Sequence, residues 1–383
     1  MSRRAVIAGV ATSDYPELPD MSEQQVHVQA SERALADAGL SFADVDGFAT
    51  AGFFPMYAVG VCEYLGLRPH HVDETNFGGA SFEVLVEHAA SAIEAGVCET
   101  VLVTYGSVQL SAMGRRLGTG GPSAPPSGPA AFDALWGNTL VGNYALAARR
   151  HMHEFGTASE QLAEIAVAMR AHAANNPMAQ YRDPISVEDV LESRMIADPL
   201  HMLDCCVISD GGGACVVTTE ERARDLQRPA VYLLGAAHAL THHMNVSQMP
   251  DLTVTAAAQS GPLAFRRAGL SPSDVDTLQV YDSFTITVLL SLEDLGFCAK
   301  GEGGAFVEAG RLQVGGGLPT NTDGGGLSAC HPGMRGMFLI VEAVRQLRGQ
   351  SLNQVDGARV AVAHGTGGML STGATLILGT EVP

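Results

Sequence analysis

A short stretch of sequence occurs twice in this chain and is the strongest constraint on its fold. Residues 38–46 and residues 268–276 both read Ala-Gly-Leu-Ser-x-x-Asp-Val-Asp, and the offset between the copies is constant. A chain of 383 residues is long enough for one large core or two medium ones. The repeat therefore indicates two similar halves.

The elements around the two copies also follow the same order. The first copy comes after a strand candidate at residues 5–10 and a helical pattern from Glu23 to Ala38 that ends at Gly39. Each copy is followed by a turn rich in Asn and Gly, a helical pattern that ends at a glycine, and an apolar strand. The sequence predicts an internal duplication of a mixed α/β unit. These later segments are 76–79, Gly96 and 101–106 in the first half, and 321–325, Gly349 and 360–365 in the second.

The sequence changes character between the halves. Residues 119–129 are rich in Gly, Pro and Ser, and amphipathic helical patterns follow around 138–155 and 159–174. This pattern is typical of an inserted lobe with a loop. We expect an N-terminal half formed by 1–106 plus 205–228, an inserted loop lobe at 107–204, and a C-terminal half at 229–383.

Composition excludes several classes of partner. The net charge is −19, and no cluster of Lys and Arg is long enough to follow a nucleic-acid backbone. No stretch reaches the roughly 18 apolar residues of a membrane span, and the apolar run near the start is too short for a secretory signal. We therefore expect a cytoplasmic protein without nucleic-acid partners. Only 16% of the residues are charged, which favours an oligomer that hides part of its surface.

The cysteines do not indicate a disulfide framework or a metal site. Their number is seven and they contain no CxxC motif, so we expect reduced thiols. Cys205 and Cys206 are adjacent and cannot comfortably chelate one zinc ion. We expect no metal.

The central part of the sequence carries a resemblance to a known family. Residues 193–200, Leu203-Asp204-Cys205 and Ser209-Asp210-Gly211 closely resemble the corresponding block of thiolases of the sterol carrier protein x type, and the match extends over nearly the whole chain. This resemblance implies the thiolase fold, in which duplicated α/β halves with mixed sheets form α-β-α-β-α layers with an inserted loop lobe. It also implies a homodimer that joins strands near the nucleophile helix.

The catalytic motifs of those thiolases are altered here. The nucleophilic cysteine aligns with a glycine, and the His-Asp-Cys-Phe motif begins with a tyrosine. The two remaining motifs keep a histidine each. The resemblance therefore implies a thiolase-like site without a thiolate nucleophile. The motifs read Gly79-Ala80-Ser81, Tyr281-Asp282-Ser283-Phe284, Cys330-His331-Pro332 and Ala363-His364-Gly365.

The pattern looks like that of thiolase-like aldolases that shorten steroid side chains. Members of that group cleave a β-hydroxyacyl-CoA into a ketone and a shorter acyl-CoA, and they work with a small partner protein that carries an OB fold and a zinc ribbon. Such a retro-aldol step needs a base, donors for an enolate and an acid, but no covalent intermediate. CoA is then part of the substrate, and no tightly bound cofactor is expected.

The resemblance assigns roles to individual residues. Tyr281 would move a proton if a neighbour such as His331 lowered its pKa, His331 would donate to the enolate oxygen, and His364 would assist. Asp282 is expected to support the site through backbone amides. The helix N-terminus at Gly79 and Ser81 would leave room and backbone donors for an oxyanion.

Other interpretations remain open from the sequence. Tyr281 could be a core aromatic residue, His331 could cap the helix that follows it, and His364 could be structural. Ser81 has no base nearby in sequence, but Cys330 lies beside a histidine and could serve as an alternative nucleophile for a thiolase-type acyltransferase. The chain could also be a non-catalytic subunit that binds acyl-CoA or a partner. The obvious phosphate partners are the pairs Arg115-Arg116, Arg149-Arg150 and Arg266-Arg267.

Overall fold

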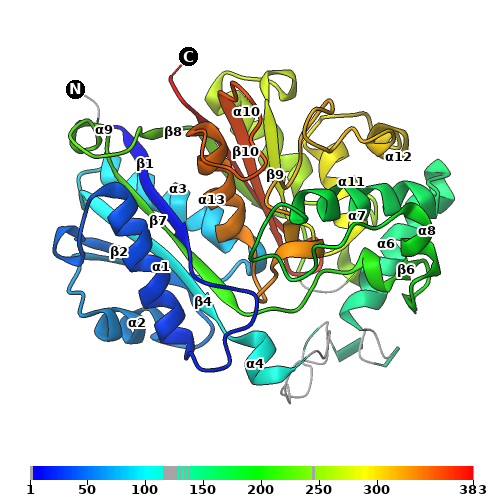
Figure 1. The fold of residues 1–383 in the computed structure, drawn as a ribbon, viewed down its shortest axis with the longest axis horizontal. Coiled ribbons are helices and arrows are strands. Elements are labelled where there is room, and N and C mark those ends of the chain that lie inside the picture. Colours follow the sequence, from blue (N-terminus) through cyan, green and yellow to red (C-terminus); the bar gives the residue numbers. More distant parts are fainter. Residues whose placement is uncertain are drawn as a thin grey trace.

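The protein contains a nine-stranded mixed sheet that runs through both halves of the chain (Figure 1). The computed structural model describes residues 3–114, 128, 131–132, 135–136, 139–243 and 246–382. The order of the strands is β3-β2-β4-β7-β1-β8-β11-β10-β9. These strands are β1 (Ala5–Thr12), β2 (Gly47–Ala51), β3 (His71–Thr75), β4 (Thr100–Ser107), β7 (Gly211–Thr219), β8 (Val231–Leu240), β9 (Thr277–Val280), β10 (Val360–Gly367) and β11 (Thr372–Gly379).

The strand order shows the duplication. Reading outward from the centre, β1-β7-β4-β2 corresponds to β8-β11-β10-β9, with the same antiparallel and parallel pairings in each half. The halves meet through a short β1–β8 ladder. The first half adds the edge strand β3, whereas the second half has only an isolated bridge between Leu278 and Thr320 at that place. The predicted duplication of a mixed α/β unit is confirmed, and the domain boundaries stay a prediction.

The repeated stretch has the same local structure in both copies. Gly39 and Gly269 end their helices with φ of 75° and 70°, a conformation that favours glycine. The last aspartate of each copy then accepts a backbone N–H from the start of a neighbouring strand. Asp46 bonds Thr100 N at 2.8 Å, and Asp276 bonds Val360 N at 2.9 Å. The repeat therefore connects a helix end to the next strand of the sheet.

Helices cover the sheet in layers. Helices α3 and α13 lie between the two halves of the sheet and share one apolar core with strands from both (Figure 1). Helices α1 and α2 cover the outer face of the first half, and α10 and α11 cover the second. The helices of the two halves are α1 (Glu23–Ala38), α2 (Tyr57–Leu65), α3 (Ser81–Glu94), α9 (Glu220–Ala223), α10 (Ala257–Ala268), α11 (Thr285–Asp294), α12 (Gly303–Val307) and α13 (Gly336–Leu347).

The inserted lobe packs against the second half. Its helices α6 and α7 join the same apolar core as α11, and a buried contact between His151 Nε2 and Glu293 Oε2 at 3.1 Å links α6 to α11. The lobe contains α4 (Gln109–Met113), α6 (Leu140–Phe155), α7 (Ser159–Ala173), α8 (Val187–Glu192) and the hairpin of β5 (Met195–Ala197) and β6 (Leu200–His201). Most of the Gly- and Pro-rich segment 119–129 lies outside the described residues.

The described part of the chain contains neither a candidate membrane span nor a candidate metal site. No helix there combines the length and the apolar character needed to cross a membrane. Those same residues contain no group of three or more His, Cys, Asp or Glu side chains placed to hold a metal ion. All seven cysteines are free thiols.

Candidate active site

Tyr281 lies directly after β9 and points into the central layer between the sheet halves. Its backbone N–H donates to His364 O at 2.9 Å, which continues the pairing of β9 with β10 and fixes the start of the side chain. The side chain is buried in the core that contains α3 and α13. The end of a parallel strand therefore places the phenol at the centre of the molecule.

The ring of Tyr281 occupies the space that a side chain at position 79 would need. A Cβ atom on Gly79 would lie 2.0 Å from Tyr281 Cε2 and 2.5 Å from Thr366 O, far inside van der Waals contact. The expectation that the helix N-terminus leaves room at Gly79 is wrong, because the phenol fills it. A thiolase-type cysteine at 79 and this placement of Tyr281 exclude one another.

The hydroxyl of Tyr281 forms a hydrogen bond with His331. Its Oη lies 3.0 Å from His331 Nε2, and the two rings are nearly perpendicular at 87°. Burial, with the Arg335 charge nearby, lowers the pKa of His331 to about 4, although this residue keeps some exposed surface. Burial raises the pKa of Tyr281 well above its usual value, and only the Arg335 backbone N–H opposes this among the main causes. Both groups are neutral near pH 7, so the phenol donates to Nε2.

The sequence therefore predicted the contact between Tyr281 and His331 correctly, but it predicted the wrong effect of His331 on the pKa of the phenol. Tyr281 and His331 are in contact, but His331 does not lower the pKa of the phenol. His331 also does not cap a helix, because α13 begins five residues later with Arg335 at its N-cap. The His331 backbone N–H instead donates to Ser209 Oγ at 2.8 Å.

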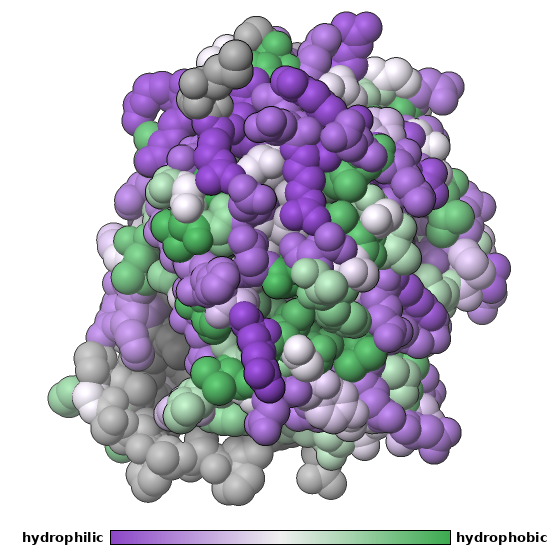
Figure 2. Space-filling model, turned by 90° about the vertical axis from the view of Figure 1, so that its left-hand side faces the viewer, coloured by the Kyte–Doolittle hydropathy of each residue, from purple (hydrophilic) through white to green (hydrophobic). Residues whose placement is uncertain are grey.

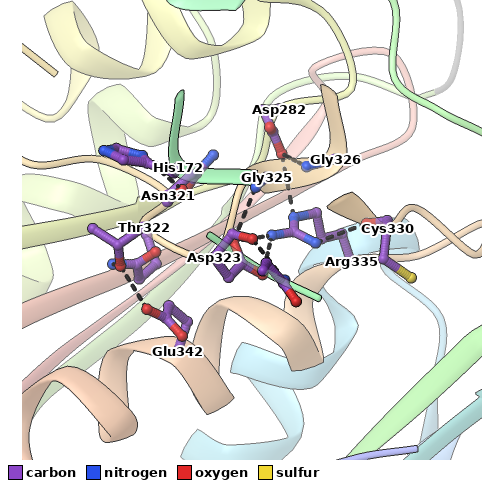
Figure 3. A network of polar contacts seen from close by, with 12 residues as sticks. His172, Asp282, Asn321, Thr322, Asp323, Gly325, Gly326, Cys330, Arg335 and Glu342 are labelled. Carbon is purple, nitrogen blue, oxygen red and sulfur yellow. Dashed lines mark hydrogen bonds and ion pairs between the residues drawn. The ribbon is translucent and has the colours of Figure 1, made fainter. Parts of the chain in front are cut away.

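Asp282 and Arg335 form a buried ionic network behind this pair (Figure 3). Asp282 accepts the N–H groups of Gly326 and Leu327 at 2.8 and 3.1 Å, and Arg335 Nε lies 3.3 Å from its Oδ1. Arg335 also donates to both oxygens of Asp323, at 2.5 and 2.6 Å, and to the carbonyl of Cys330 at 2.7 Å. Burial raises the pKa of Asp282 to about 6, against the opposing Arg335 charge. The network fixes the π-helical turn 325–329 and the segment that carries His331.

Comparisons with known proteins agree with this geometry. The family described as "Thiolase C-terminal domain-like" matches residues 238–380. A steroid side-chain-cleaving aldolase of Thermomonospora curvata is 38% identical over 98% of both chains. The chain belongs to the thiolase superfamily. Within it, the 17-hydroxy-3-oxo-4-pregnene-20-carboxyl-CoA lyase of Mycobacterium tuberculosis is 37% identical over 96% of this chain and 97% of its own.

Solved structures show the same relationship. The Ltp2-ChsH2(DUF35) aldolase has a TM-score of 0.88 and 35% identity, and the match covers 98% of this chain and 97% of that one. Human mitochondrial 3-ketoacyl-CoA thiolase has a TM-score of 0.71 at 16% identity over 98% of both chains. The second likeness concerns the fold alone. Two of the full-length relatives are thus named as aldolase and lyase, and a third, 34% identical over 98% of this chain and 99% of its own, is named as an acetyl-CoA acetyltransferase of Methanothermobacter thermautotrophicus.

Cys330 lies on the opposite side of its segment from the Tyr281–His331 pair. Its backbone is extended, with φ −159° and ψ 130°, so that neighbouring side chains point in opposite directions. The thiol lies 3.1 Å from Ser209 Oγ and packs with Tyr15 and Phe338. Burial raises its pKa to about 12. Adjacency in sequence to His331 therefore does not supply a base, and the geometry does not support Cys330 as a nucleophile.

His364 is directed away from the site. Gly365, its neighbour on β10, faces α3, since a Cβ there would lie 2.4 Å from Glu83 Oε2. His364 therefore faces the other side of the sheet, where its Nδ1 lies 2.9 Å from Thr375 Oγ1 and Thr375 in turn contacts Ser260 of α10. The expectation that His364 assists catalysis is corrected by the alternation of side chains along a strand.

Ser81 shapes the turn before α3. Its hydroxyl donates to Gly78 O at 2.6 Å and accepts the N–H of Phe77 at 2.9 Å, while Asn76 Oδ1 accepts the N–H of Gly78 at 3.0 Å. Side chains of the turn itself thus satisfy two backbone N–H groups at this helix end. Ser81 is a structural residue of this turn.

Sequence reasoning missed Glu83, one helical turn after Gly79. Its side chain is fully buried, and neither carboxylate oxygen has a hydrogen-bond partner among the described residues. The carboxyl group lies where Gly336 and Gly365 have no side chains, since a Cβ on either would lie 2.5 or 2.4 Å from Oε2. Burial raises its pKa to about 8. A lone glutamate within the apolar run 82–86 was the signal in the sequence.

A cavity of about 560 Å³ opens beside the site and is lined by Arg170, Arg194 and Leu327, among others. An adjoining cavity shares Arg170 and adds Arg182. None of these three arginines has an ion-pair partner within the part of the chain that the structure describes. Their positive charge contrasts with the net charge of −19 of the chain. Arg170 is held by hydrogen bonds to Ser328 Oγ at 2.9 Å and to Asp183 O at 3.0 Å, and Asp183 lines the adjoining cavity.

The arginine pairs singled out in the sequence lie elsewhere. Arg149 pairs with Asp198, Arg150 with Glu154, and Arg267 with Glu87. Arg115-Arg116 lies outside the described residues. Arginines that are far apart in sequence, and not the adjacent pairs, gather at the cavity.

Proposed function

We propose that this protein cleaves the Cα–Cβ bond of a β-hydroxyacyl-CoA by a retro-aldol reaction, without an acyl-enzyme. The observation that carries the proposal is the position of Tyr281, whose ring takes the place of a nucleophilic side chain at 79 and whose hydroxyl bonds His331. The names of two full-length relatives support a sterol-derived or branched acyl group.

The Tyr281–His331 pair can first take one proton from the substrate and later return one proton to it. As the Cα–Cβ bond breaks, the β-hydroxyl proton moves to Tyr281 Oη while the phenol proton moves to His331 Nε2. The β-carbon becomes a ketone, and the bonding electrons become the enolate of the thioester. The imidazolium next to this enolate then returns the proton through Tyr281 to the α-carbon. No proton and no free CoA is consumed overall.

The electrostatics of the pair suit this cycle. A histidine with a pKa of about 4 is neutral before the reaction and a strong acid after it takes up a proton. The Arg335 backbone N–H, which opposes the rise in the pKa of Tyr281, helps the phenol oxygen to carry negative charge as its proton leaves. Asp282 acts as a positioning residue, because its contacts are with the turn 325–329 and Arg335.

The arginine-lined cavity is proposed to hold the CoA part of the substrate. Arg170, Arg182 and Arg194 supply positive charge for its phosphates, and guanidinium groups bind phosphate in a bidentate manner. The cavity wall continues into the site, since Val207 N donates to Gly326 O at 2.8 Å and Cys206 N to Ser283 O at 2.9 Å. The proposal therefore has the thioester end of CoA near Tyr281.

The assembly is also part of the proposal. Among the described residues β3 is an edge strand of the sheet, and several apolar side chains on it and on the segment 53–64 are exposed. Apolar surface is also visible between hydrophilic areas on the face shown in Figure 2. Pairing of β3 with its copy in a homodimer would cover this surface. The exposed residues are Phe53, Phe54, Met56, Val59, Tyr64 and Val72.

We further propose a small partner protein with an OB fold and a zinc ribbon. The solved relative whose name joins Ltp2 to ChsH2, a DUF35 protein, supports this part of the proposal. Co-expression with a DUF35 protein encoded near this chain, followed by size-exclusion chromatography with light scattering, tests both associations. A monomer at micromolar concentration, or the absence of a joint complex, would contradict the respective proposal.

The reaction is tested with a 3-hydroxyacyl-CoA whose β-carbon is tertiary, incubated with the protein together with its partner where one is found. Mass spectrometry should show a ketone and a shorter acyl-CoA without added CoA, and Cys330→Ala should retain this cleavage. Cleavage that needs a 3-keto substrate and free CoA, or a trapped acyl-cysteine, would show a thiolase instead.

A further inference from the structure

The turn that precedes His331 has an unusual backbone. Residues Gly325–Ala329 form a π-helical turn, and Gly324 and Gly325 have positive φ angles of 102° and 67°. Such turns are rare in proteins and occur frequently at functional sites. The turn leads directly into Cys330 and His331, so its conformation determines where the imidazole lies.

Asp282 holds one side of this turn (Figure 3). It accepts the N–H groups of Gly326 and Leu327 at 2.8 and 3.1 Å. A Cβ atom at Gly326 would lie 3.0 Å from Asp282 Oδ1 and 3.1 Å from His331 Cδ2. This side of the turn is therefore packed against both the imidazole and the residue that follows Tyr281.

Helix α7 holds the other side of the turn. A Cβ atom at Gly324 would lie 2.6 Å from Ala173 Cβ, so the helix packs directly against the residue before the turn. Arg170, three residues before Ala173 on α7, donates from Nε to Ser328 Oγ at 2.9 Å. Both of these side chains are buried. A single side-chain hydrogen bond thus joins a cavity cation to the turn.

The rim of the arginine-lined cavity is bonded to the same turn through the backbone. Gln180 N donates to Ala329 O, and Tyr181 N donates to Ser328 O, each at 3.0 Å. Gln180 and Tyr181 line both of the cavities that share Arg170. Two backbone hydrogen bonds and one side-chain hydrogen bond therefore connect the cavity with the segment that carries the catalytic imidazole.

Arg170 keeps hydrogen-bonding capacity for a ligand. Of the five N–H groups of a guanidinium, Nε–H is used by Ser328, and one on Nη1 is used by Asp183 O at 3.0 Å. A phosphate that binds the remaining N–H groups fixes the plane of the guanidinium. Because Nε–H lies in that plane, a bound phosphate also favours the arrangement in which Ser328 Oγ accepts its hydrogen bond.

We propose that the turn 325–329 couples the binding of a polyanion at Arg170 to the placement of His331, with Ser328 as the positioning residue. This inference rests on the proposed function, in which the polyanion is the phosphate end of the acyl-CoA. It adds that this end of the substrate, which takes no part in bond cleavage, organises the proton-transfer pair. Binding energy from a remote part of the substrate then raises kcat and not only affinity.

The kinetic test removes the phosphates from the substrate and the hydroxyl from the turn, separately and together. The substrates are a tertiary 3-hydroxyacyl-CoA and the same acyl group on pantetheine, which lacks the phosphates. In wild type, kcat should be higher for the CoA thioester. Ser328→Ala should lower the ratio of the two kcat values by about tenfold, within the usual range of coupling between two sites. An unchanged ratio would overturn the role of Ser328.

Ser291→Ala is the matched control. Ser291 and Ser328 are both 1% exposed, and Ser291 also loses one hydrogen bond on substitution, from its Oγ to Thr287 O at 2.7 Å. That bond lies within α11, so the ratio of kcat values should stay at the wild-type value. A similar fall of the ratio in both variants would show a general effect of losing a buried hydroxyl and would contradict the coupling.

Hydrogen exchange separates this inference from the proposed reaction, because it needs no cleavage. Free CoA is the ligand, added to the protein with its partner where one is found, and mass spectrometry follows exchange in peptides that cover 325–335. We expect saturating CoA to slow this exchange about fivefold or more in wild type and in Ser291→Ala, with little effect in Ser328→Ala.

The outcomes of the two tests are independent. Protection that depends on Ser328 would support the coupling even if no hydroxyacyl-CoA is cleaved, in which case the proposed reaction fails. No protection in wild type, or equal protection in wild type and Ser328→Ala, overturns the inference whatever the result for cleavage.

Discussion

The two halves of the chain use the same strand, turn and helix order, but their turns before α3 and α13 differ in kind. The first turn, 76–80, is short, is held by its own Asn76 and Ser81 side chains, and has no side chain at Gly79. The second, 321–335, is longer and contains the buried ionic network and His331. The duplicated halves thus share a symmetric frame, and their unequal turns put the Tyr281–His331 pair, to which we assign proton transfer, in the second half.

This comparison predicts that substitutions in the second half alter turnover and buried polar contacts, whereas substitutions in the first half alter packing. Tyr281→Phe keeps the ring that fills the space at Gly79 and removes the hydroxyl that bonds His331. We expect kcat to fall by roughly 10²–10⁴ with little change in stability. Tyr232→Phe, on β8, is the control. A fully active Tyr281→Phe variant would remove the phenol from the mechanism.

Arg335→Met tests the buried network of the second turn. The substitution leaves Asp282 and Asp323 buried without their cation, and such a loss costs about 3–5 kcal/mol of unfolding free energy. Urea unfolding measures it. Arg150→Ala, which breaks an exposed pair with Glu154, should cost less than about 1 kcal/mol. Similar losses for the two variants would contradict the difference in burial.

Gly79→Ala tests the packing of the first turn. The added methyl group would overlap the Tyr281 ring, so we expect a loss of about 1–3 kcal/mol in unfolding free energy. The loss should become smaller when Gly79→Ala is made in a Tyr281→Ala background, because the ring is then absent and only the overlap with Thr366 O remains. Additive losses in this double-mutant cycle would show that the two residues do not compete for one space.

Glu83→Gln tests the buried carboxyl of the first half by its pH dependence. Glu83 keeps its proton in the folded protein up to about pH 8, but loses it above its ordinary pKa of 4.5 in the unfolded chain. Unfolding between these values releases a proton, so the stability due to Glu83 is full below pH 4.5 and falls as pH rises to 8. The slope approaches about 1.4 kcal/mol per pH unit and vanishes above pH 8.

The variant removes this slope, because glutamine does not titrate. Urea unfolding at pH 5, 6.5 and 8 should show wild type losing stability relative to Glu83→Gln, whereas Glu94→Gln at the exposed end of α3 should follow wild type. Parallel curves for wild type and Glu83→Gln would mean that the carboxyl ionises normally in the folded state.

The order of the elements and the duplication of the protein could be predicted from local sequence patterns. The repeat at 38–46 and 268–276 predicted the duplication, because helix ends and turns depend on local residues such as Gly39 and Gly269. The helical patterns at Glu23–Ala38 and 159–174 became α1 and α7 for the same reason. The altered motifs also predicted a thiolase-superfamily site without its cysteine, and Tyr281 and His331 as neighbours.

The surroundings of each of those side chains, in contrast, depend on contacts between distant parts of the chain. His364 and Cys330 occur in motifs, but strand alternation directs one to α10 and the other to an apolar cluster. The space left by Gly79 is filled by a ring 202 positions away in the chain, a contact that no local pattern contains. Burial results from the packing of distant segments of the chain. It lowers the pKa of His331 and raises the pKa of Glu83. Local residues thus determine where helices and strands form, because their signals lie within a few residues of one another. Which side chains face one another depends on long-range packing.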